Sequence, residues 1–385
     1  MTLATRQIQT QMALSSRIIT ALNAAADVGE RVVLATVVRI TGSSYGGVGT
    51  RMVIRPDGST IGIVSGGCLE ADLAEHARQV HSSCEANVVT YDTRADDDAA
   101  WGLGLGCNGL IDVLLEPLKG STATSVARML ELARDADNPA VVATVIASST
   151  SRVGSHLLIH DGSVEVIGEF PRRIIDDIGR DSHDAFAERR RGMVRDYDGV
   201  TVAFEVITPA IRLVICGSGP DVVPLVRVGT ELGWNLTVVD HRPVEHAHPE
   251  RFPGARVVDC PEPQLLAQTV ALTPHTAAVV MSHHYARDLE YMKALLASRA
   301  PYIGMLGPRA RTERMLADIA ASGLAVSMGD RLFSPVGLDI GAEGPDAIAL
   351  AIVAEVSATL TGSSAGHLRD RRGLLHQPQP EVRVS

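Results

Sequence analysis

The chain has few cysteines, few aromatic residues, no excess of positive charge and no long apolar run. Its five cysteines are scattered and include no C-x-x-C pair, which argues against a disulfide framework and against a structural zinc site. The formal net charge of −10 leaves no basic surface for nucleic acid or anionic lipid. No apolar run reaches membrane-spanning length, and no apolar segment follows a basic start. We therefore expect a cytoplasmic protein with reduced thiols that binds neither nucleic acid nor membranes.

The first half of the chain carries an internal repeat. A length of 385 residues with 45% apolar content suffices for two or three domains. Three segments recur in the same order, each pair reading as strand or turn: 33–38 with 141–146, 48–54 with 153–159, and 57–59 with 161–163. The order strand, loop, strand, Asp-Gly turn and strand is typical of hairpins. We predict an N-terminal α+β domain, residues 1–208, with a strand-hairpin unit duplicated at 33–67 and 141–170.

Residues 65–70 (SGGCLE) join a predicted strand at 58–64 to a predicted amphipathic helix. This arrangement places the Cys68 thiol at or near the first helical turn, where free N–H groups and the macrodipole stabilise a thiolate and lower its pKa. Gly66 and Gly67 allow a bulky ligand to approach the backbone. We predict that Gly66, Gly67, Cys68 and Glu70 bind a cofactor. The alternative is that Cys68 is a small buried residue at a tight turn.

A second glycine-rich segment, residues 101–109 (WGLGLGCNG), precedes a predicted strand at 110–115. Such a loop can surround a ligand with backbone amides, so Gly106 and Cys107 are further candidates. The alternative is an ordinary connection anchored by Trp101. The acidic run at 96–98 is interpreted as a solvated loop rather than a site for a divalent cation.

A second pattern begins after the break at 208–210, and it predicts a Rossmann-like, doubly wound domain over residues 209–362. A buried-type strand at 213–216 is followed by Gly217 and Gly219, a helix, and a second strand that ends in Asp240. The glycines would permit a tight turn and the close approach of a phosphate, and Asp240 would accept hydrogen bonds from a ribose. Val222 stands where the dinucleotide fingerprint has Gly or Ala, and Asp240 equally fits a turn or capping role.

Further strands at 277–281 and 302–306 continue the α/β alternation and bring polar residues to their carboxyl ends. In such folds these ends line the ligand crevice. His283 and His284 are therefore candidates for hydrogen bonding or proton transfer, and Arg309 and Arg311 for phosphate binding. The alternative is a solvated histidine pair and solvated arginines. We also predict an exposed helix over the charged stretch 172–197 and a disordered tail at 363–385.

Together, these segments resemble the XdhC/CoxI family of xanthine dehydrogenase accessory proteins. The segments that carry the resemblance, in the family's order along nearly the whole chain, are 66–70 (GGCLE), 101–107 (WGLGLGC), 217–219 (GSG), 304–309 (GMLGPR) and 335–342 (PVGLDIGA). The resemblance implies a protein that binds molybdenum cofactor, supports its sulfuration and inserts it into the apo form of a molybdenum hydroxylase. It also implies a cysteine desulfurase as a further partner. Molybdenum is a soft metal, so a thiolate at Cys68 or Cys107 would suit it as a contact.

Two other functions stay open on the sequence alone. One is an NAD(P)-dependent oxidoreductase that binds the nucleotide at Gly217, Gly219 and Asp240 and uses His283 or His284 in turnover. The other is a regulatory ligand-binding protein without a delivery role. A cofactor-binding chaperone fits the motifs better than a catalyst. We expect a homodimer, because dimers are the commonest soluble oligomers.

Overall fold

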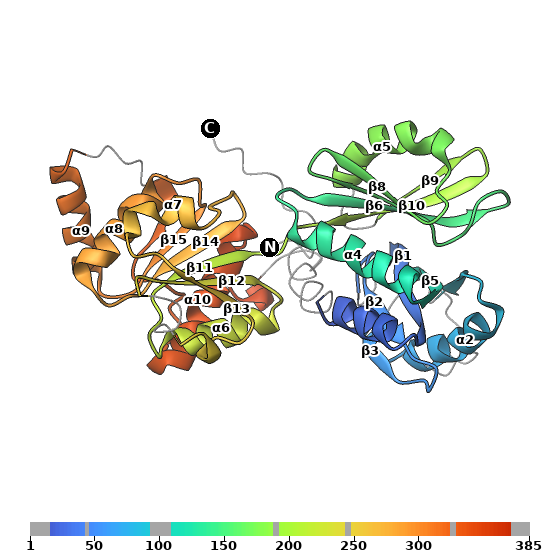
Figure 1. Cartoon of the computed structure of the whole chain (residues 1–385), viewed down its shortest axis with the longest axis horizontal. Helices are drawn as coiled ribbons and strands as arrows, with labels where there is room; N and C mark the ends of the chain where they lie inside the picture. The colour runs from blue at the N-terminus through green and yellow to red at the C-terminus, as the bar shows by residue number, and fades with distance from the viewer. Residues whose placement is uncertain are drawn as a thin grey trace. The chain divides into compact units, whose positions relative to one another are not determined.

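The computed structural model describes residues 16–42, 46–92, 109–187, 192–242, 248–323 and 329–370. Within them the chain forms two compact units that divide between Pro209 and Ala210 (Figure 1). Gly106, Cys107, the acidic run at 96–98 and the tail from residue 371 lie outside the described residues. Among the residues that are described, no helix combines the length and the apolar character that crossing a membrane requires.

The N-terminal unit contains two five-stranded antiparallel sheets with the same topology. The first has the order β3-β2-β1-β5-β4 and the second the order β8-β7-β6-β10-β9. The first sheet consists of β1 (Arg31–Gly42), β2 (Arg51–Ile54), β3 (Thr60–Gly62), β4 (Asn87–Asp92) and β5 (Gly109–Lys119). The second consists of β6 (Ala140–Ser148), β7 (His156–His160), β8 (Ser163–Ile167), β9 (Met193–Tyr197) and β10 (Val200–Ile207). The helical elements are a helix over 16–27, α2 (Glu70–Ser83), α4 (Ser121–Asp135), the 3₁₀ turn η1 (Arg172–Ile174) and α5 (Ile175–Ala187).

The internal repeat is confirmed, and it extends further than the sequence indicated. Each copy continues past its three-stranded hairpin unit into a helix and two more strands, in the order β-β-β-α-β-β. Equivalent residues share the same register, since Thr36 pairs with Arg51 in one sheet and Thr144 with His156 in the other. The second copy also corrects one prediction. The helix predicted over 172–197 ends at 187, and residues 193–197 form β9, an edge strand in which the consecutive charged residues Arg195 and Asp196 are exposed.

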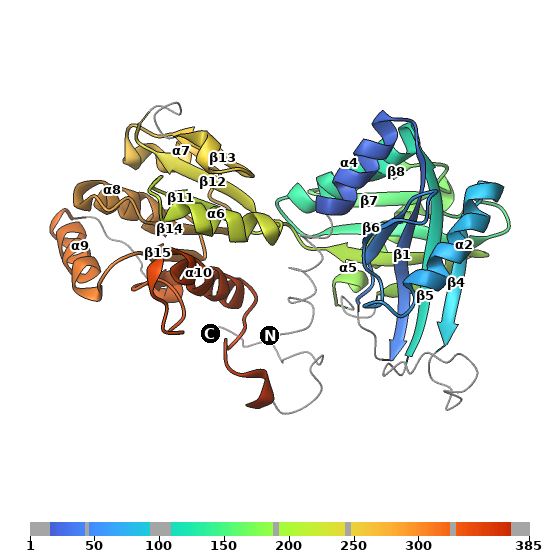
Figure 2. The same cartoon turned by 90° about the horizontal axis from the view of Figure 1, so that it is seen from below.

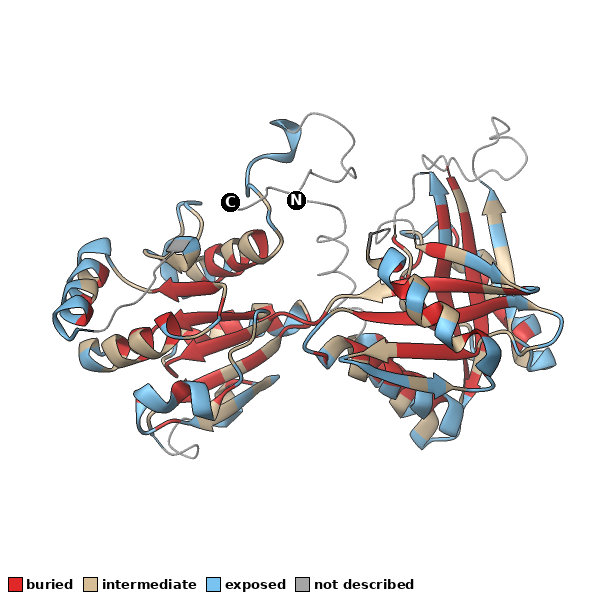
Figure 3. Ribbon diagram, turned by 90° about the horizontal axis from the view of Figure 1, so that it is seen from above, coloured by how far each residue is buried: buried red, intermediate tan, exposed pale blue. Residues whose placement is uncertain are grey.

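Both sheets are buried on two faces. Alternate residues of β1 face either α2, through Val33 and Ala35, or the helices 16–27 and α4, through Val32 and Leu34. One face of the second sheet likewise packs against α5. Figure 2 shows the strands of the two sheets crossing one another, and Figure 3 shows the central strands buried along most of their length. A bulge interrupts the pairing at Val38 and, in the second copy, at Ile146, and these two residues share one core cluster.

The C-terminal unit is a six-stranded parallel sheet with the order β13-β12-β11-β14-β15-β16, which is the Rossmann order 3-2-1-4-5-6. Its strands are β11 (Arg212–Cys216), β12 (Asn235–Asp240), β13 (Ala255–Asp259), β14 (Thr276–Val280), β15 (Tyr302–Met305) and β16 (Leu332–Phe333). Its helices are α6 (Val222–Glu231), α7 (Leu266–Thr269), α8 (Tyr285–Leu296), α9 (Arg309–Ala321) and α10 (Gly344–Leu360). Short 3₁₀ turns are η3 (Pro249–Arg251), η4 (Pro263–Leu265), η5 (Gly329–Arg331) and η6 (Leu368–Asp370). Helices α6 and α10 cover one face of the sheet, and α7, α8 and α9 contribute to the core on the other. This fold confirms the predicted doubly wound class.

Candidate functional site

The Cys68 loop, residues 64–70, connects β3 to α2 and leaves the thiol exposed. Gly66 and Gly67 adopt φ values of +84° and +114°, which other residues rarely reach. Leu69 is 3% exposed and packs in the core between the first sheet and α2, so it fixes the loop to the fold. Cys68 lies between these two features and is exposed to solvent. The alternative of a buried cysteine at this turn is therefore wrong.

The carboxylate of Glu70 organises this loop from within. Its oxygens accept hydrogen bonds from the N–H groups of Val64 (3.0 Å), Ser65 (2.8 Å), Gly67 (2.9 Å) and Leu69 (3.1 Å), and from the Ser65 hydroxyl (2.6 Å). Burial alone would raise the pKa of Glu70, but the hydrogen bonds from Ser65 and Val64 outweigh it and leave that pKa below its ordinary value. Glu70 is thus the anion that the loop amides bind.

This geometry changes the roles that the sequence suggested. Helix α2 begins at Glu70 with Leu69 as its N-cap, so Cys68 precedes the helix. The N–H groups of Gly67 and Leu69 donate to Glu70, so the prediction that free amides at this turn stabilise a thiolate or an incoming anion is wrong for these two groups. What the loop offers instead is an exposed thiol on a backbone held by an internal carboxylate.

The other described cysteines differ from Cys68 in burial or in setting. Cys216 and Cys260 are buried in the C-terminal unit, and burial raises the pKa of both thiols. Cys84 is exposed, but it lies at the opposite end of α2, in a left-handed C-cap conformation. Within the described ranges, no three His, Cys, Asp or Glu side chains are grouped so as to hold a metal ion.

In the C-terminal unit, the predicted glycine turn lies at the switch point of the sheet, between β11 and β14. Gly217 has a φ of +134°, and a Cβ there would lie 2.7 Å from the carbonyl oxygen of Met281. Only glycine therefore fits this close crossing of two loops. Gly219 follows, and α6 begins at Val222 after the N-cap residue Asp221.

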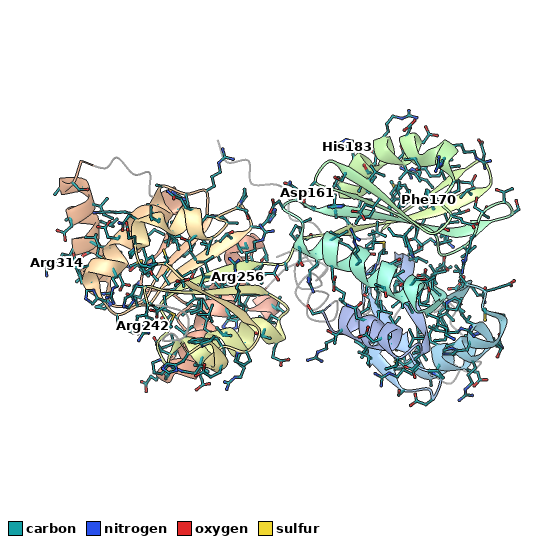
Figure 4. All side chains as sticks on the ribbon, viewed as in Figure 1. Asp161, Phe170, His183, Arg242, Arg256 and Arg314 are labelled. Carbon is teal, nitrogen blue, oxygen red and sulfur yellow. The ribbon has the colours of Figure 1, made fainter. Side chains whose placement is uncertain are left out.

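The carboxylate of Asp240, at the end of β12, is already occupied. Asp240 is 3% exposed and accepts hydrogen bonds from the Arg242 backbone N–H (2.8 Å), from its guanidinium (2.9 Å at each oxygen) and from the Ser218 hydroxyl. Burial opposes ionisation, yet these contacts lower the pKa of Asp240 well below its ordinary value. Arg242 lies beyond the end of β12 (Figure 4). Asp240 therefore has the turn role that the sequence offered as an alternative, and not the expected role of ribose acceptor.

The remaining candidates line the same edge of the parallel sheet and are only partly available to a ligand. His283 adopts a φ of +60°, and its Nε2 lies 2.7 Å from an oxygen of Asp221. Arg311 donates to the fully buried carboxylate of Asp288 (2.7 Å), which also accepts from the Ser282 hydroxyl. His284 is the N-cap residue of α8 without a side-chain capping hydrogen bond, and Arg309 is exposed at the first turn of α9.

Two buried polar pairs that were not predicted join the repeats of the N-terminal unit. Arg51 on β2 pairs with Glu205 on β10, and the equivalent pair joins His156 on β7 to Glu116 on β5 (2.8 Å). All four residues are less than a tenth exposed. A charged residue inside an otherwise apolar strand is the signal that could have found them.

Comparisons with known proteins agree with this architecture. Residues 213–356 match the XdhC Rossmann domain, and residues 25–92 match the XdhC and CoxI family. The chain is 33% identical to a probable xanthine dehydrogenase component of Bacillus subtilis, over 88% of this chain and 96% of the relative. It is 22% identical to the molybdenum cofactor insertion chaperone PaoD of Escherichia coli, over 86% of this chain and 83% of the relative.

A solved structure extends the likeness to the fold. The crystal structure of a xanthine dehydrogenase from Bacillus halodurans matches with a TM-score of 0.71 and 31% identity. The match covers 91% of this chain and 98% of that one. Because the Bacillus subtilis relative matches at 33% identity along nearly its whole length, the chain belongs to the XdhC and CoxI family.

Proposed function

We propose that this chain binds molybdenum cofactor as cargo and inserts it into an apo molybdenum hydroxylase of the xanthine dehydrogenase type. Family membership supports an accessory role, and one relative carries the name of a molybdenum cofactor insertion chaperone. The observation that carries the proposal is the Cys68 loop, where an exposed thiol lies on a backbone held by Glu70.

The chemistry of this loop suits the cargo. Molybdenum and its dithiolene ligands are soft, and a thiolate is the soft donor among protein side chains. Because the carboxylate of Glu70 already accepts hydrogen bonds from the loop amides, the Cys68 thiol is the group that this loop exposes to solvent. We propose Cys68 as a contact to the cofactor, with Gly66 and Gly67 allowing its approach, and Cys107 with Gly106 as a second contact.

The crevice of the Rossmann unit is proposed to bind a phosphate-bearing part of the cofactor. The backbone N–H groups of Ser218 and Gly219 and the exposed guanidinium of Arg309 have the required charge and position at the sheet edge. His283 and His284 would donate hydrogen bonds there. Support of sulfuration together with a cysteine desulfurase, a cytoplasmic location and a homodimeric state are the finer parts of this proposal.

The alternative function, an NAD(P)-dependent oxidoreductase, gains less support from the geometry. A ribose diol needs a free carboxylate at Asp240, and both of its oxygens are engaged by Arg242 and Ser218. Binding NAD in the usual way would require these contacts to break.

The test is cofactor retention by the purified full-length protein, measured as molybdenum and pterin per chain. Wild type is compared with Cys68→Ala, Cys107→Ala and the control Cys84→Ala, an exposed cysteine at the far end of α2. We expect retention by wild type and Cys84→Ala and its loss in Cys68→Ala or Cys107→Ala. Tight NAD binding by the same samples without cofactor retention would contradict the proposal.

A further inference from the structure

A pocket of about 210 Å³ opens in the N-terminal unit, separate from the Cys68 loop. Its wall is formed by the first turn of α4, the end of β5 and the turns that flank β7 and β8. Ala86, which follows α2, is also part of the wall, whereas Cys68 precedes that helix. A 14-residue helix is about 21 Å long, so the pocket and the thiol lie at opposite ends of α2.

One hydroxyl in this wall has no partner. The side chain of Ser155 is part of the lining and is only 1% exposed, and its Oγ makes no hydrogen bond to any described residue. Across from it, Gly168 has a φ of +83°, and a Cβ there would lie 3.2 Å from that oxygen. Glycine therefore keeps open the space beside the hydroxyl. A buried polar group without a partner is costly, which indicates a ligand or water at this place.

The repeat provides an internal comparison. Thr50 is the equivalent of Ser155 in the first copy, and its hydroxyl donates to the Gly47 carbonyl (2.7 Å) and accepts from the Gly47 N–H (3.1 Å). The next residue is Arg51 in the first copy and the smaller His156 in the second. The unsatisfied hydroxyl is therefore a property of the second copy and not of the fold.

The charges around the pocket favour an anion of single charge. Helix α4 begins at Ser121 with Gly120 as its N-cap, so no side chain caps it, and its first turn holds no acid. Arg152 lines the pocket and is exposed to solvent. The carboxylate of Glu116 is also in the wall, held by His156 Nε2 at 2.8 Å, and it would repel a doubly charged group more strongly than a singly charged one.

We propose that this pocket binds a small organic monocarboxylate. Its carboxylate lies at the first turn of α4, within reach of Arg152 and the hydroxyls of Ser121 and Ser155, and its apolar part lies against Val153 and Ile167. A cavity of about 150 Å³ accommodates benzene, so 210 Å³ suits a molecule the size of benzoate. This site is separate from the Cys68 loop and independent of the proposed cofactor function.

The test is calorimetric titration of the full-length protein with benzoate, benzamide and inorganic phosphate at millimolar concentrations. Benzamide has the shape of benzoate without its charge, and phosphate has charge without the apolar part. We expect benzoate to bind at least about tenfold more tightly than either, since one lost charge contact of about 1.4 kcal/mol corresponds to that factor. Absence of benzoate binding, equal binding of benzamide or tighter binding of phosphate would overturn the proposal.

Two variants locate the binding and separate it from folding. Arg152→Ala should weaken benzoate binding about tenfold, whereas Arg128→Ala, an exposed arginine of α4 outside the pocket lining, should leave it unchanged. Ser121→Asp places a carboxylate at the start of α4, which favours the helix and repels the ligand. We expect this variant to melt no lower than wild type and to lose benzoate binding. Unchanged binding in Ser121→Asp would contradict the assignment.

Discussion

Replacing Glu70 by Gln should loosen the Cys68 loop without removing any side-chain volume. One glutamate oxygen accepts from Val64 and Ser65 N–H, and the other from Gly67 and Leu69 N–H and the Ser65 hydroxyl. A glutamine amide keeps one oxygen and turns the other position into a donor. Whichever way it is oriented, two backbone N–H groups lose their acceptor.

The magnitude follows from those two groups. A donor left without its acceptor costs about 1–3 kcal/mol when it is buried. Because the hydrogen bond from Gly67 is exposed and the other three are only partly buried, these N–H groups can be rehydrated and the low end applies, which gives about 2 kcal/mol for the pair. At about 1.4 kcal/mol per factor of ten, local opening of the loop becomes roughly 30-fold more frequent.

Hydrogen exchange of the peptide that covers residues 64–70 measures this opening directly. We expect roughly 30-fold faster exchange in Glu70→Gln. The control is Glu75→Gln, because Glu75 lies on the same helix, is 64% exposed and contacts only Arg78 among the described residues, a pair that contributes about 0.5 kcal/mol or less. If the peptide exchanged at the same rate in Glu70→Gln and Glu75→Gln, the role given to Glu70 would be refuted.

The difference in loop opening between wild type and Glu70→Gln should also depend on pH. The folded-state pKa of Glu70 lies below the ordinary value of 4.5, so its stabilising effect is complete above that value. It is lost as the pH falls through the lowered pKa, when the carboxylate takes up a proton. The ratio of the exchange rates of this peptide in Glu70→Gln and in wild type should therefore shrink below pH 4.5. A difference that stays constant into acid would contradict this account.

Three further predictions concern the rest of the fold. Glu205→Leu leaves Arg51 buried without its partner and should lower the free energy of unfolding by about 3–5 kcal/mol in a denaturant titration, and adding Arg51→Leu should restore most of it. Asp240→Asn should lower the melting temperature at pH 7, and the difference should fade as the pH drops below 3.8, because contacts with a cation and a hydroxyl lower the folded-state pKa of Asp240. Gly217→Ala should destabilise by about 1–3 kcal/mol, whereas Gly179→Ala, on α5 with open space around it, should stabilise by up to about 1 kcal/mol, both read from thermal melts.

The two folds were largely predictable because they follow from apolar patterns and from glycines. The recurrence of similar apolar segments indicated the duplicated sheet, and strand, glycine turn, helix and strand indicated the Rossmann unit. The predicted repeat stopped at residue 170, because the helix and the last two strands of each copy share little sequence. Strand β9 was predicted as helix, since its exposed Arg195 and Asp196 resemble a solvated helical surface.

The site chemistry was harder to predict because carboxylate partners depend on how loops close. Glu70 looked like a group for a ligand, yet its side chain turns back onto the amides of its own loop. Asp240 followed the spacing of a ribose acceptor, and the residue two positions later, Arg242, occupies it. An acid followed at that distance by arginine is the signal that favours the turn role. No sequence pattern indicated the open space beside Ser155, since it depends on Gly168 from another turn.

The most direct test of the central claim is transfer of molybdenum cofactor to an apo molybdenum hydroxylase of the xanthine dehydrogenase type. Purified protein loaded with cofactor is mixed with the apo-enzyme, and the recovered hydroxylase activity is compared with that obtained from an equal amount of free cofactor. We expect faster and more complete activation by the loaded wild-type protein, and no advantage over free cofactor for Cys68→Ala or Cys107→Ala. Activation by the loaded wild-type protein that is no better than with free cofactor would contradict the insertion role.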